Sequence, residues 1–92
     1  MDKDGWRKFI QVLTHVDDPK TLETLSKLFF TPEERESLAG RARIIQELIQ
    51  GKRTQREIAK KYGISIAKIT RGSNALKEIS DEMKEYLIRV ME

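Results

Sequence analysis

The sequence predicts an all-α protein, because apolar residues recur at helical spacing along most of its 92 residues and no segment shows the alternation of a strand. The start signals of helices support this fold class. Thr31–Glu34 and Thr54–Glu57 each have the threonine and glutamate spacing of a capping box. Pro19 and Pro32 suit the first position of a helix. Together these signals predict six helices.

The first three predicted helices occupy the N-terminal half of the chain. The first covers residues 2 to about 17 and ends at Asp17-Asp18-Pro19, and the second runs from Pro19 to Phe30. The third begins after Thr31 and ends at Gly51. The apolar stripes of these helices are Trp6, Phe9, Ile10, Val12, Leu13 and Val16, then Leu22, Leu25, Leu28, Phe29 and Phe30, and then Leu38, Ala42, Ile45, Leu48 and Ile49.

The fourth and fifth predicted helices lie within residues 54–77 and meet at a sharp turn. Thr54 caps the first of them, Ser65 caps the second, and Gly63 between them tolerates a positive φ. Two short helices joined in this way form a helix-turn-helix, whose second helix can enter the major groove of DNA. The residues that we expect to be buried are Ile58, Ala59, Tyr62, Ile64, Ile66, Ala67 and Ile69.

A sixth, amphipathic helix follows Ser80-Asp81. Its apolar side consists of Met83, Tyr86, Leu87, Val90 and Met91. Nothing in the sequence is repetitive or linker-like, so we expect a single helical domain over residues 1–92.

The composition excludes several classes of protein. The chain has no cysteine and a single histidine, His15, so it lacks a disulfide framework and the ligands of a zinc finger. No stretch approaches the roughly 18 apolar residues of a membrane span, and the N-terminus lacks the apolar region of a signal peptide. We therefore expect a cytoplasmic protein with no membrane partner. An enzyme is the least favoured interpretation, because no side chains have catalytic spacing and Ser73 near Arg71 lacks a base.

Positive charge is concentrated in the predicted helix-turn-helix. Residues 52–77 contain eight basic residues and one acidic residue, Glu57, a net charge of +7 in a chain whose total is +3. Such a run can simply be a solvated face of an ordinary helical hairpin, but here it would lie against the phosphates of DNA. The expected DNA contacts are Gln55, Arg56, Lys60, Gly63, Ser65, Ile66, Ala67, Lys68, Thr70, Ser73 and Asn74.

Gly72 lies inside the fifth predicted helix, where glycine costs on the order of 1 kcal/mol relative to alanine. Its presence predicts that something approaches the backbone closely at this position. A flat ligand and a second helix are the two alternatives that the residues leave open.

Three blocks of the sequence carry a resemblance to a known family. They are LFFTPEERE at residues 28–36, RARIIQEL at residues 41–48 and, most specific, TQRE at residues 54–57 followed by ITRGSNALK at residues 69–77. In these blocks, and over roughly residues 20–91, the chain resembles the Trp repressor family, the tryptophan-responsive repressors of bacteria.

The resemblance implies an intertwined homodimer of six-helix chains. Residues 1–50 and 79–92 would form the dimer core, and residues 54–77 would form the helix-turn-helix that reads DNA. An N-terminal helix that capped its own chain would instead give a stable monomer. The function implied is that of a transcriptional repressor that binds double-stranded operator DNA. L-tryptophan would act as its corepressor rather than as a catalytic cofactor. The repressor would control genes of tryptophan biosynthesis or uptake.

The resemblance also implies a tryptophan site. Arg71 would pair with the carboxylate of the amino acid, Arg41 would cover the indole, and Gly72 would leave room for it. The hydroxyl of Thr31 and the carbonyls around Leu28 and Phe30 would hold the polar groups. The full set of expected ligand contacts is Leu28, Phe30, Thr31, Arg41, Lys68, Arg71, Gly72 and Ala75.

Two of these positions depart from the best-known members of the family. Lys68 stands where they have threonine, and Ala75 stands where a serine helps to hold the ammonium group. A lost hydrogen bond to a charged group costs roughly 1.5–3 kcal/mol if nothing replaces it. These departures favour the alternative of a helix-turn-helix module that binds DNA without a ligand. A helical protein that binds another protein and has no role on DNA is the third alternative.

Overall fold

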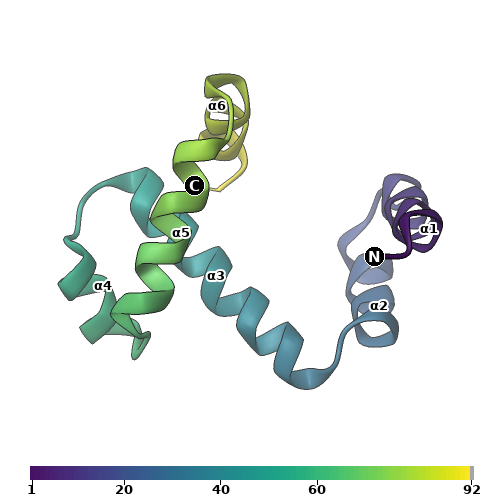
Figure 1. Ribbon diagram of the computed structural model, residues 1–92, viewed down its shortest axis with the longest axis horizontal. Helices are drawn as coiled ribbons and strands as arrows, with labels where there is room; N and C mark the ends of the chain where they lie inside the picture. Colours follow the sequence, from purple (N-terminus) through teal and green to yellow (C-terminus); the bar gives the residue numbers. More distant parts are fainter. Residues whose placement is uncertain (92) are drawn as a thin grey trace. The chain divides into compact units, whose positions relative to one another are not determined.

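The computed structural model describes residues 1–91, which contain six helices and no strand (Figure 1). By contacts along the chain they form two units, residues 1–35 and residues 36 onward, which are described separately below. The helices are α1 (Lys3–Thr14), α2 (Pro19–Phe29), α3 (Pro32–Gln50), α4 (Gln55–Tyr62), α5 (Ile66–Glu78) and α6 (Asp81–Val90). The all-α fold class and the six predicted helices are confirmed.

The capping residues predicted from the sequence are confirmed. Thr31 and Glu34 form a capping box, in which the Thr31 N–H donates to Glu34 Oε1 at 2.8 Å and the Glu34 N–H donates to Thr31 Oγ1 at 3.1 Å. Thr54 and Glu57 form the second box, at 2.9 and 3.2 Å. Ser65 accepts from the Lys68 N–H at 3.2 Å and begins α5.

α1 is shorter than predicted, because it ends at Thr14 rather than near residue 17. At this end the imidazole Nδ1 of His15 donates to the carbonyl of Gln11 at 2.8 Å, so a side chain uses the acceptor that the next backbone N–H would need. The backbone N–H of His15 bonds instead to Val12, one residue closer, at 3.2 Å. His15 therefore has a structural role.

The first unit is built on aromatic contacts between α1 and α2. The ring of Phe9 lies 5.3 Å from Trp6, 5.2 Å from Phe29 and 5.8 Å from Phe30, between ring centroids. No side chain of α1 or α2 is fully buried. An apolar hollow of about 350 Å³ opens beside the cluster, lined by Met1, Asp2, Gly5, Trp6, Phe9, Phe29 and Phe30.

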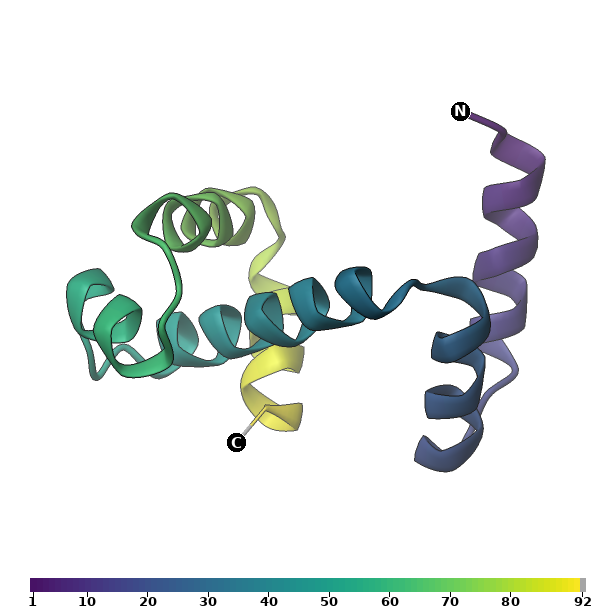
Figure 2. The same ribbon diagram turned by 90° about the horizontal axis from the view of Figure 1, so that it is seen from below.

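The second unit has a small apolar core of three isoleucines, Ile44 from α3, Ile58 from α4 and Ile69 from α5. Figures 1 and 2 show α4 and α5 beside the C-terminal part of α3, which is the part that supplies Ile44. The partly buried side chains that pack around this core are Leu48, Ala59, Tyr62 and Ile64. The three helices that contain the predicted helix-turn-helix and its support therefore share one core.

Burial within these helices differs from the prediction at several positions. Leu38 and Ala42, predicted on the buried stripe of α3, are exposed, whereas Ile44 is buried. α4 and α5 pack on the C-terminal part of α3, so the apolar residues nearer the N-terminus of α3 have no helix of this unit to pack against. Ile66 and Ala67 were predicted to be buried and are also exposed. Ala67 is two residues from Ile69 and so lies on the opposite side of α5, whereas Ile66 is on the side of Ile69 but at the first position of the helix, outside the isoleucine core.

The close approach predicted at Gly72 is that of a second helix. A Cβ atom at Gly72 would lie 2.7 Å from Cγ2 of Ile44, closer than such atoms come in real structures. Gly72 is buried, and glycine is the residue that lets α5 lie this near to α3.

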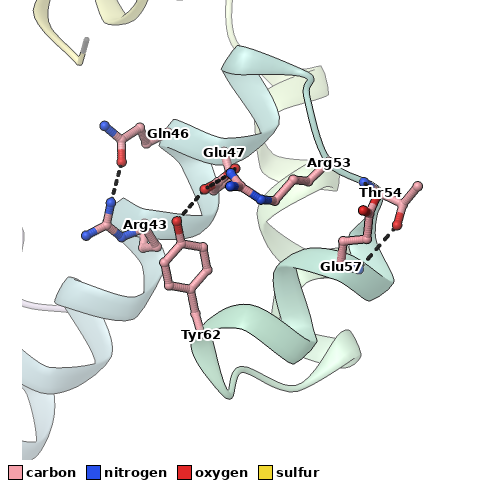
Figure 3. A network of polar contacts seen from close by, with 7 residues as sticks. All are labelled: Arg43, Gln46, Glu47, Arg53, Thr54, Glu57 and Tyr62. Carbon is pink, nitrogen blue, oxygen red and sulfur yellow. Dashed lines mark hydrogen bonds and ion pairs between the residues drawn. The ribbon is translucent and has the colours of Figure 1, made fainter.

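A buried carboxylate links α3 to α4 and to the loop between them (Figure 3). Glu47 of α3 is 3% exposed and accepts hydrogen bonds from the Tyr62 hydroxyl at the end of α4 and from Arg53 in the loop before α4. Nη1 of Arg53 lies 2.9 Å from Oε1 and 3.0 Å from Oε2 of Glu47. We refer to Glu47, Arg53 and Tyr62 as the polar clamp.

The hydrogen bond from Tyr62 is the main cause that holds the pKa of Glu47 below its ordinary value of 4.5, and Arg53 adds to it. The same hydrogen bond raises the pKa of Tyr62 above its ordinary value of 10.0, because the hydroxyl must keep its proton to donate it. The clamp therefore favours an ionised Glu47 beside a neutral Tyr62.

Gly72→Ala should lower the free energy of unfolding by about 1–3 kcal/mol, the usual cost of overpacking, because the new methyl group meets Ile44. Urea denaturation followed by circular dichroism measures this change. Gly40→Ala is the matched control in the interior of α3, because a Cβ there has open space around it. Alanine is favoured over glycine inside a helix, so Gly40→Ala should raise the stability, and a Gly72 variant stabilised to the same extent would show that α3 and α5 do not approach this closely.

Glu47→Gln should flatten the acid side of the stability curve. A carboxylate whose folded-state pKa is lowered stabilises the fold above its ordinary pKa of 4.5, and this contribution is lost as the pH falls through the folded-state value. The melting temperature of the parent should therefore fall more steeply than that of the variant below about pH 4.5. Tyr62 acts on the alkaline side, where its contribution is lost as the pH rises through its raised pKa.

Glu36→Gln, an exposed carboxylate of α3, is the control for this measurement and should leave the acid slope as it is in the parent. Parallel acid limbs for the parent and the Glu47 variant would contradict the assignment of Glu47 as a group that stabilises the fold.

Candidate nucleic-acid interface

The turn between α4 and α5 has the geometry that the helix-turn-helix requires. Gly63 adopts φ 64° and ψ 34°, the left-handed conformation, as the sequence predicts. The N–H of Ile64 donates to the carbonyl of Ala59 at 3.2 Å, which closes the end of α4 in the manner of a Schellman motif. Ser65 then caps α5, so two residues separate Gly63 from the first turn of the second helix.

α5 has one buried face and one exposed face. Ile69 and Gly72 are buried, and they are three residues apart on the side toward α3 and α4. The exposed side includes four of the predicted DNA contacts, Ile66, Ala67, Thr70 and Asn74, with Ile66 45% exposed. An apolar side chain exposed in the first turn is placed where small and apolar groups contact base edges and thymine methyl groups.

The remaining predicted DNA contacts also lie on α4, the turn and α5. Arg56 and Lys60 are exposed on α4, while Gln55 at its first position and Ser73 on α5 are partly buried. Gly63, Ser65 and Lys68 are exposed at the turn and in the first turn of α5. One connected pair of helices therefore carries all eleven predicted residues.

Glu57 is the one acidic residue of this segment, and it is used as a capping group. The backbone N–H of Thr54 donates to it and lowers its pKa below the ordinary value of 4.5. The carboxylate thus faces the N-terminus of α4, where negative charge is favoured. The net charge of residues 52–77 therefore stays strongly positive, because their one carboxylate is used in the cap.

The predicted ligand contacts of the second unit lie on α3 and α5. Arg41 and Arg71 are exposed, and within residues 1–91 neither guanidinium has a hydrogen-bond or ion-pair partner. Lys68 is exposed and Ala75 is partly buried. Gly72 is in contact with Ile44, so this glycine serves helix packing.

The predicted ligand contacts of the first unit lie where α2 ends and α3 begins. The carbonyl of Phe30 accepts from Nη1 of Arg35 at 2.9 Å, and Thr31 Oγ1 accepts from the Glu34 N–H. Leu28 is 75% exposed. Four residues after Leu28 is Pro32, which has no N–H to donate, so the Leu28 carbonyl lacks the usual helical partner.

The polar clamp was not predicted from the sequence. Its members are ordinary charged and aromatic residues 6 and 15 positions apart, and no short motif joins them. One signal was available, since Glu47 lies three residues after Ile44 and thus on the same face of α3.

Within residues 1–91, no group of three or more histidine, aspartate and glutamate side chains could hold a metal ion. The same residues contain no helix of the length and apolarity that crossing a bilayer requires.

Comparison with known proteins agrees with the resemblance seen in the sequence. The family model of the Trp repressor protein matches residues 4–91, so the similarity extends into α1 and begins earlier than the predicted residue 20. Curated relatives include the Trp operon repressor homologs of Chlamydia trachomatis serovar D, Chlamydia caviae and Vibrio vulnificus.

These relatives resemble the chain over most of their length. The Chlamydia trachomatis protein is 46% identical over 86 residues, which cover 94% of this chain and 92% of the relative. The Chlamydia caviae protein is 48% identical, with coverage of 94% and 85%. The Vibrio vulnificus protein is 40% identical, with coverage of 95% and 85%. The chain therefore belongs to the Trp repressor family, whose members are DNA-binding transcriptional repressors and not enzymes.

Proposed function

We propose that this chain forms a homodimeric repressor that binds operator DNA through α4 and α5 and is activated by L-tryptophan. The observation that carries the proposal is the division of α5 into a face buried on Ile44 and Ile58 and an exposed face that begins with Ile66. A second helix held in this way presents its N-terminal residues to the major groove. The genes controlled would be those of tryptophan biosynthesis or uptake, and the protein would act in the cytoplasm.

Two kinds of DNA contact follow from the positions of these residues. The cations Arg56 and Lys60 on α4 suit the phosphate backbone, where each contact releases counterions. Ile66, Ala67 and Thr70 on α5 suit base edges, because they are apolar or small side chains at the start of the helix. Phosphate contacts supply affinity for any duplex, and base contacts supply preference for one sequence.

Arg41 and Arg71 support a tryptophan site in this proposal. Each is an exposed guanidinium without a hydrogen-bond or ion-pair partner within residues 1–91, and they lie on different helices, α3 and α5. A guanidinium can stack on an indole ring and can also pair with a carboxylate. We assign the carboxylate to Arg71 and the ring to Arg41. The contacts expected near Leu28, Phe30 and Thr31 stay predictions.

The apolar surface of the single chain supports a dimer. Large apolar side chains remain exposed in the first unit and on α6, where Leu28 is 75% and Val90 57% exposed. No side chain of α1, α2 or α6 is fully buried. An apolar surface of this extent is typical of residues that a second chain covers.

A DNA-binding module that needs no ligand is the second candidate. Lys68 and Ala75 favour it, because a serine or threonine hydroxyl at these positions would help to hold a ligand. The contact of Gly72 with Ile44 also favours the ligand-independent module, since a side chain of the protein, and not a ligand, lies against this glycine.

A gel shift with and without L-tryptophan distinguishes the two candidates. The probe is a duplex selected by the parent protein from a random-sequence pool in the presence of tryptophan. For a tryptophan-activated repressor we expect retardation to depend on the ligand, and Arg71→Ala should lose that dependence because the carboxylate partner is gone.

Arg89→Ala, which removes the same charge from α6, is the control and should respond to tryptophan as the parent does. Equal retardation of the parent with and without tryptophan would instead support the ligand-independent module. No retardation of any duplex at low salt would leave the third alternative, a protein without a role on DNA.

Lys60→Ala should weaken binding to all duplexes to a similar extent, because a phosphate contact is lost and no base contact changes. The slope of the logarithm of affinity against the logarithm of salt concentration should become shallower by roughly 1 per binding site. Lys20→Ala on α2 removes the same charge from the other unit and is the control. A salt slope identical to that of the parent would remove Lys60 from the interface.

A further inference from the structure

We infer that the polar clamp of Glu47, Arg53 and Tyr62 positions the helix-turn-helix on α3 and thereby sets the affinity for operator DNA. The inference rests on the proposed function, because operator binding is the activity that the clamp would tune. None of the three residues is among the expected contacts to DNA or to tryptophan, so they act through the placement of α4 and α5.

The clamp joins three segments at one carboxylate. Glu47 comes from α3, Arg53 from the loop between α3 and α4, and Tyr62 from the end of α4 (Figure 3). Nη1 of Arg53 lies between both carboxylate oxygens, at 2.9 and 3.0 Å, and this charge-assisted contact holds the loop beside α3. No side-chain nitrogen or oxygen buried within residues 1–91 lacks a hydrogen-bond partner, so the network is fully satisfied.

Tyr62 is also held by its ring. The guanidinium carbon of Arg43, one turn before Glu47 on α3, lies 5.0 Å from the ring centroid, and Nζ of Lys61 lies 5.4 Å from it. Tyr62 directly precedes Gly63, the residue at which the chain turns toward α5. A side chain fixed at both its ring and its hydroxyl at this position fixes the start of the turn.

The polar clamp restricts the orientation of α4 on α3, which the apolar core alone restricts only weakly. The contacts among Ile44, Ile58 and Ile69 are apolar and tolerate small rotations of one helix over another. A buried carboxylate does not tolerate them, because moving α4 away from α3 would leave Glu47 without its donors. The arrangement of α4 on α3 in the structure is therefore favoured over neighbouring arrangements.

Operator affinity depends on the fraction of molecules whose helices are correctly placed. The apparent dissociation constant equals the intrinsic constant divided by that fraction. Loss of the clamp should lower the fraction without removing any contact to DNA. Affinity for an operator, which needs both helices in register with the groove, should then fall more than affinity for arbitrary DNA.

Tyr62→Phe tests this inference, because it removes the hydroxyl and keeps the ring that Arg43 and Lys61 contact. Affinity for the duplex selected by the parent protein should fall about three- to tenfold. Affinity for a scrambled duplex should stay within about twofold, and the salt slope should not change, because the number of phosphate contacts is the same. Tyr86→Phe removes the other tyrosine hydroxyl, which makes no hydrogen bond within the described residues, and should bind as the parent does.

Affinity of Tyr62→Phe for the selected duplex within twofold of the parent would overturn the inference, as would an equal loss on both duplexes. Circular dichroism at the assay temperature determines whether the variant is folded. If it is not, Arg53→Gln replaces it, since glutamine lacks the guanidinium that donates to Glu47, and Lys52→Gln at the exposed neighbouring position is the control for the lost charge.

Amide hydrogen exchange without DNA separates failure of the clamp from failure of the proposed function. Amides of α4 and the turn should exchange faster in Tyr62→Phe than in the parent, whereas those of α1 and α2 should not change. Unchanged exchange in α4 would overturn the inference even if the protein binds DNA. Faster exchange in Tyr62→Phe, together with a parent protein that prefers no DNA sequence, would keep the clamp and reject the proposed function.

Discussion

The close approach of α3 to α5 is the constraint on which the second unit depends. Because Gly72 has no Cβ, Ile44 can reach the backbone of α5, and Ile69 on the same face can join Ile58 in the core. The exposed face of α5 follows from this contact, since burying Ile69 and Gly72 turns Ala67 and Thr70 outward, while Ile66 is exposed at the first position of the helix. One glycine therefore fixes which side chains a DNA duplex could meet.

The sequence predicted well what depends on neighbouring residues. The capping residues Thr31, Thr54 and Ser65 and the left-handed Gly63 act within three or four positions, and all of them are confirmed. Helical periodicity predicted an apolar stripe on each helix, but it was wrong about which residues of α3 and α5 are buried. Leu38 fits the helical pattern, but no element of its unit lies there to bury it, so periodicity alone cannot decide which part of a long helix is covered.

The polar clamp lay beyond sequence reasoning for a physical reason. Glu47 and Tyr62 are 15 positions apart, and their contact exists only after the turn at Gly51 and the loop with Arg53 have brought α4 back onto α3. Single glutamate and arginine residues such as Glu47 and Arg53 are usually solvated surface groups. A buried carboxylate with two donors is a property of the folded arrangement, and the candidate site likewise needed the structure to show which face of α5 is free.

The two contacts of α3 with the helix-turn-helix bear on how a small molecule could regulate the protein. A ligand can shift an equilibrium only by its preference for one state over the other, so its effect is limited by the freedom that the protein retains without it. Ile44 on Gly72 and Glu47 on Tyr62 both restrict α4 and α5 in the single chain. In the proposed repressor, tryptophan would order only the motion that these contacts permit. The two candidate functions, a tryptophan-activated repressor and a ligand-independent module, thus differ in how much motion the helix-turn-helix retains without ligand, and the inferred clamp is a contact that would limit this motion.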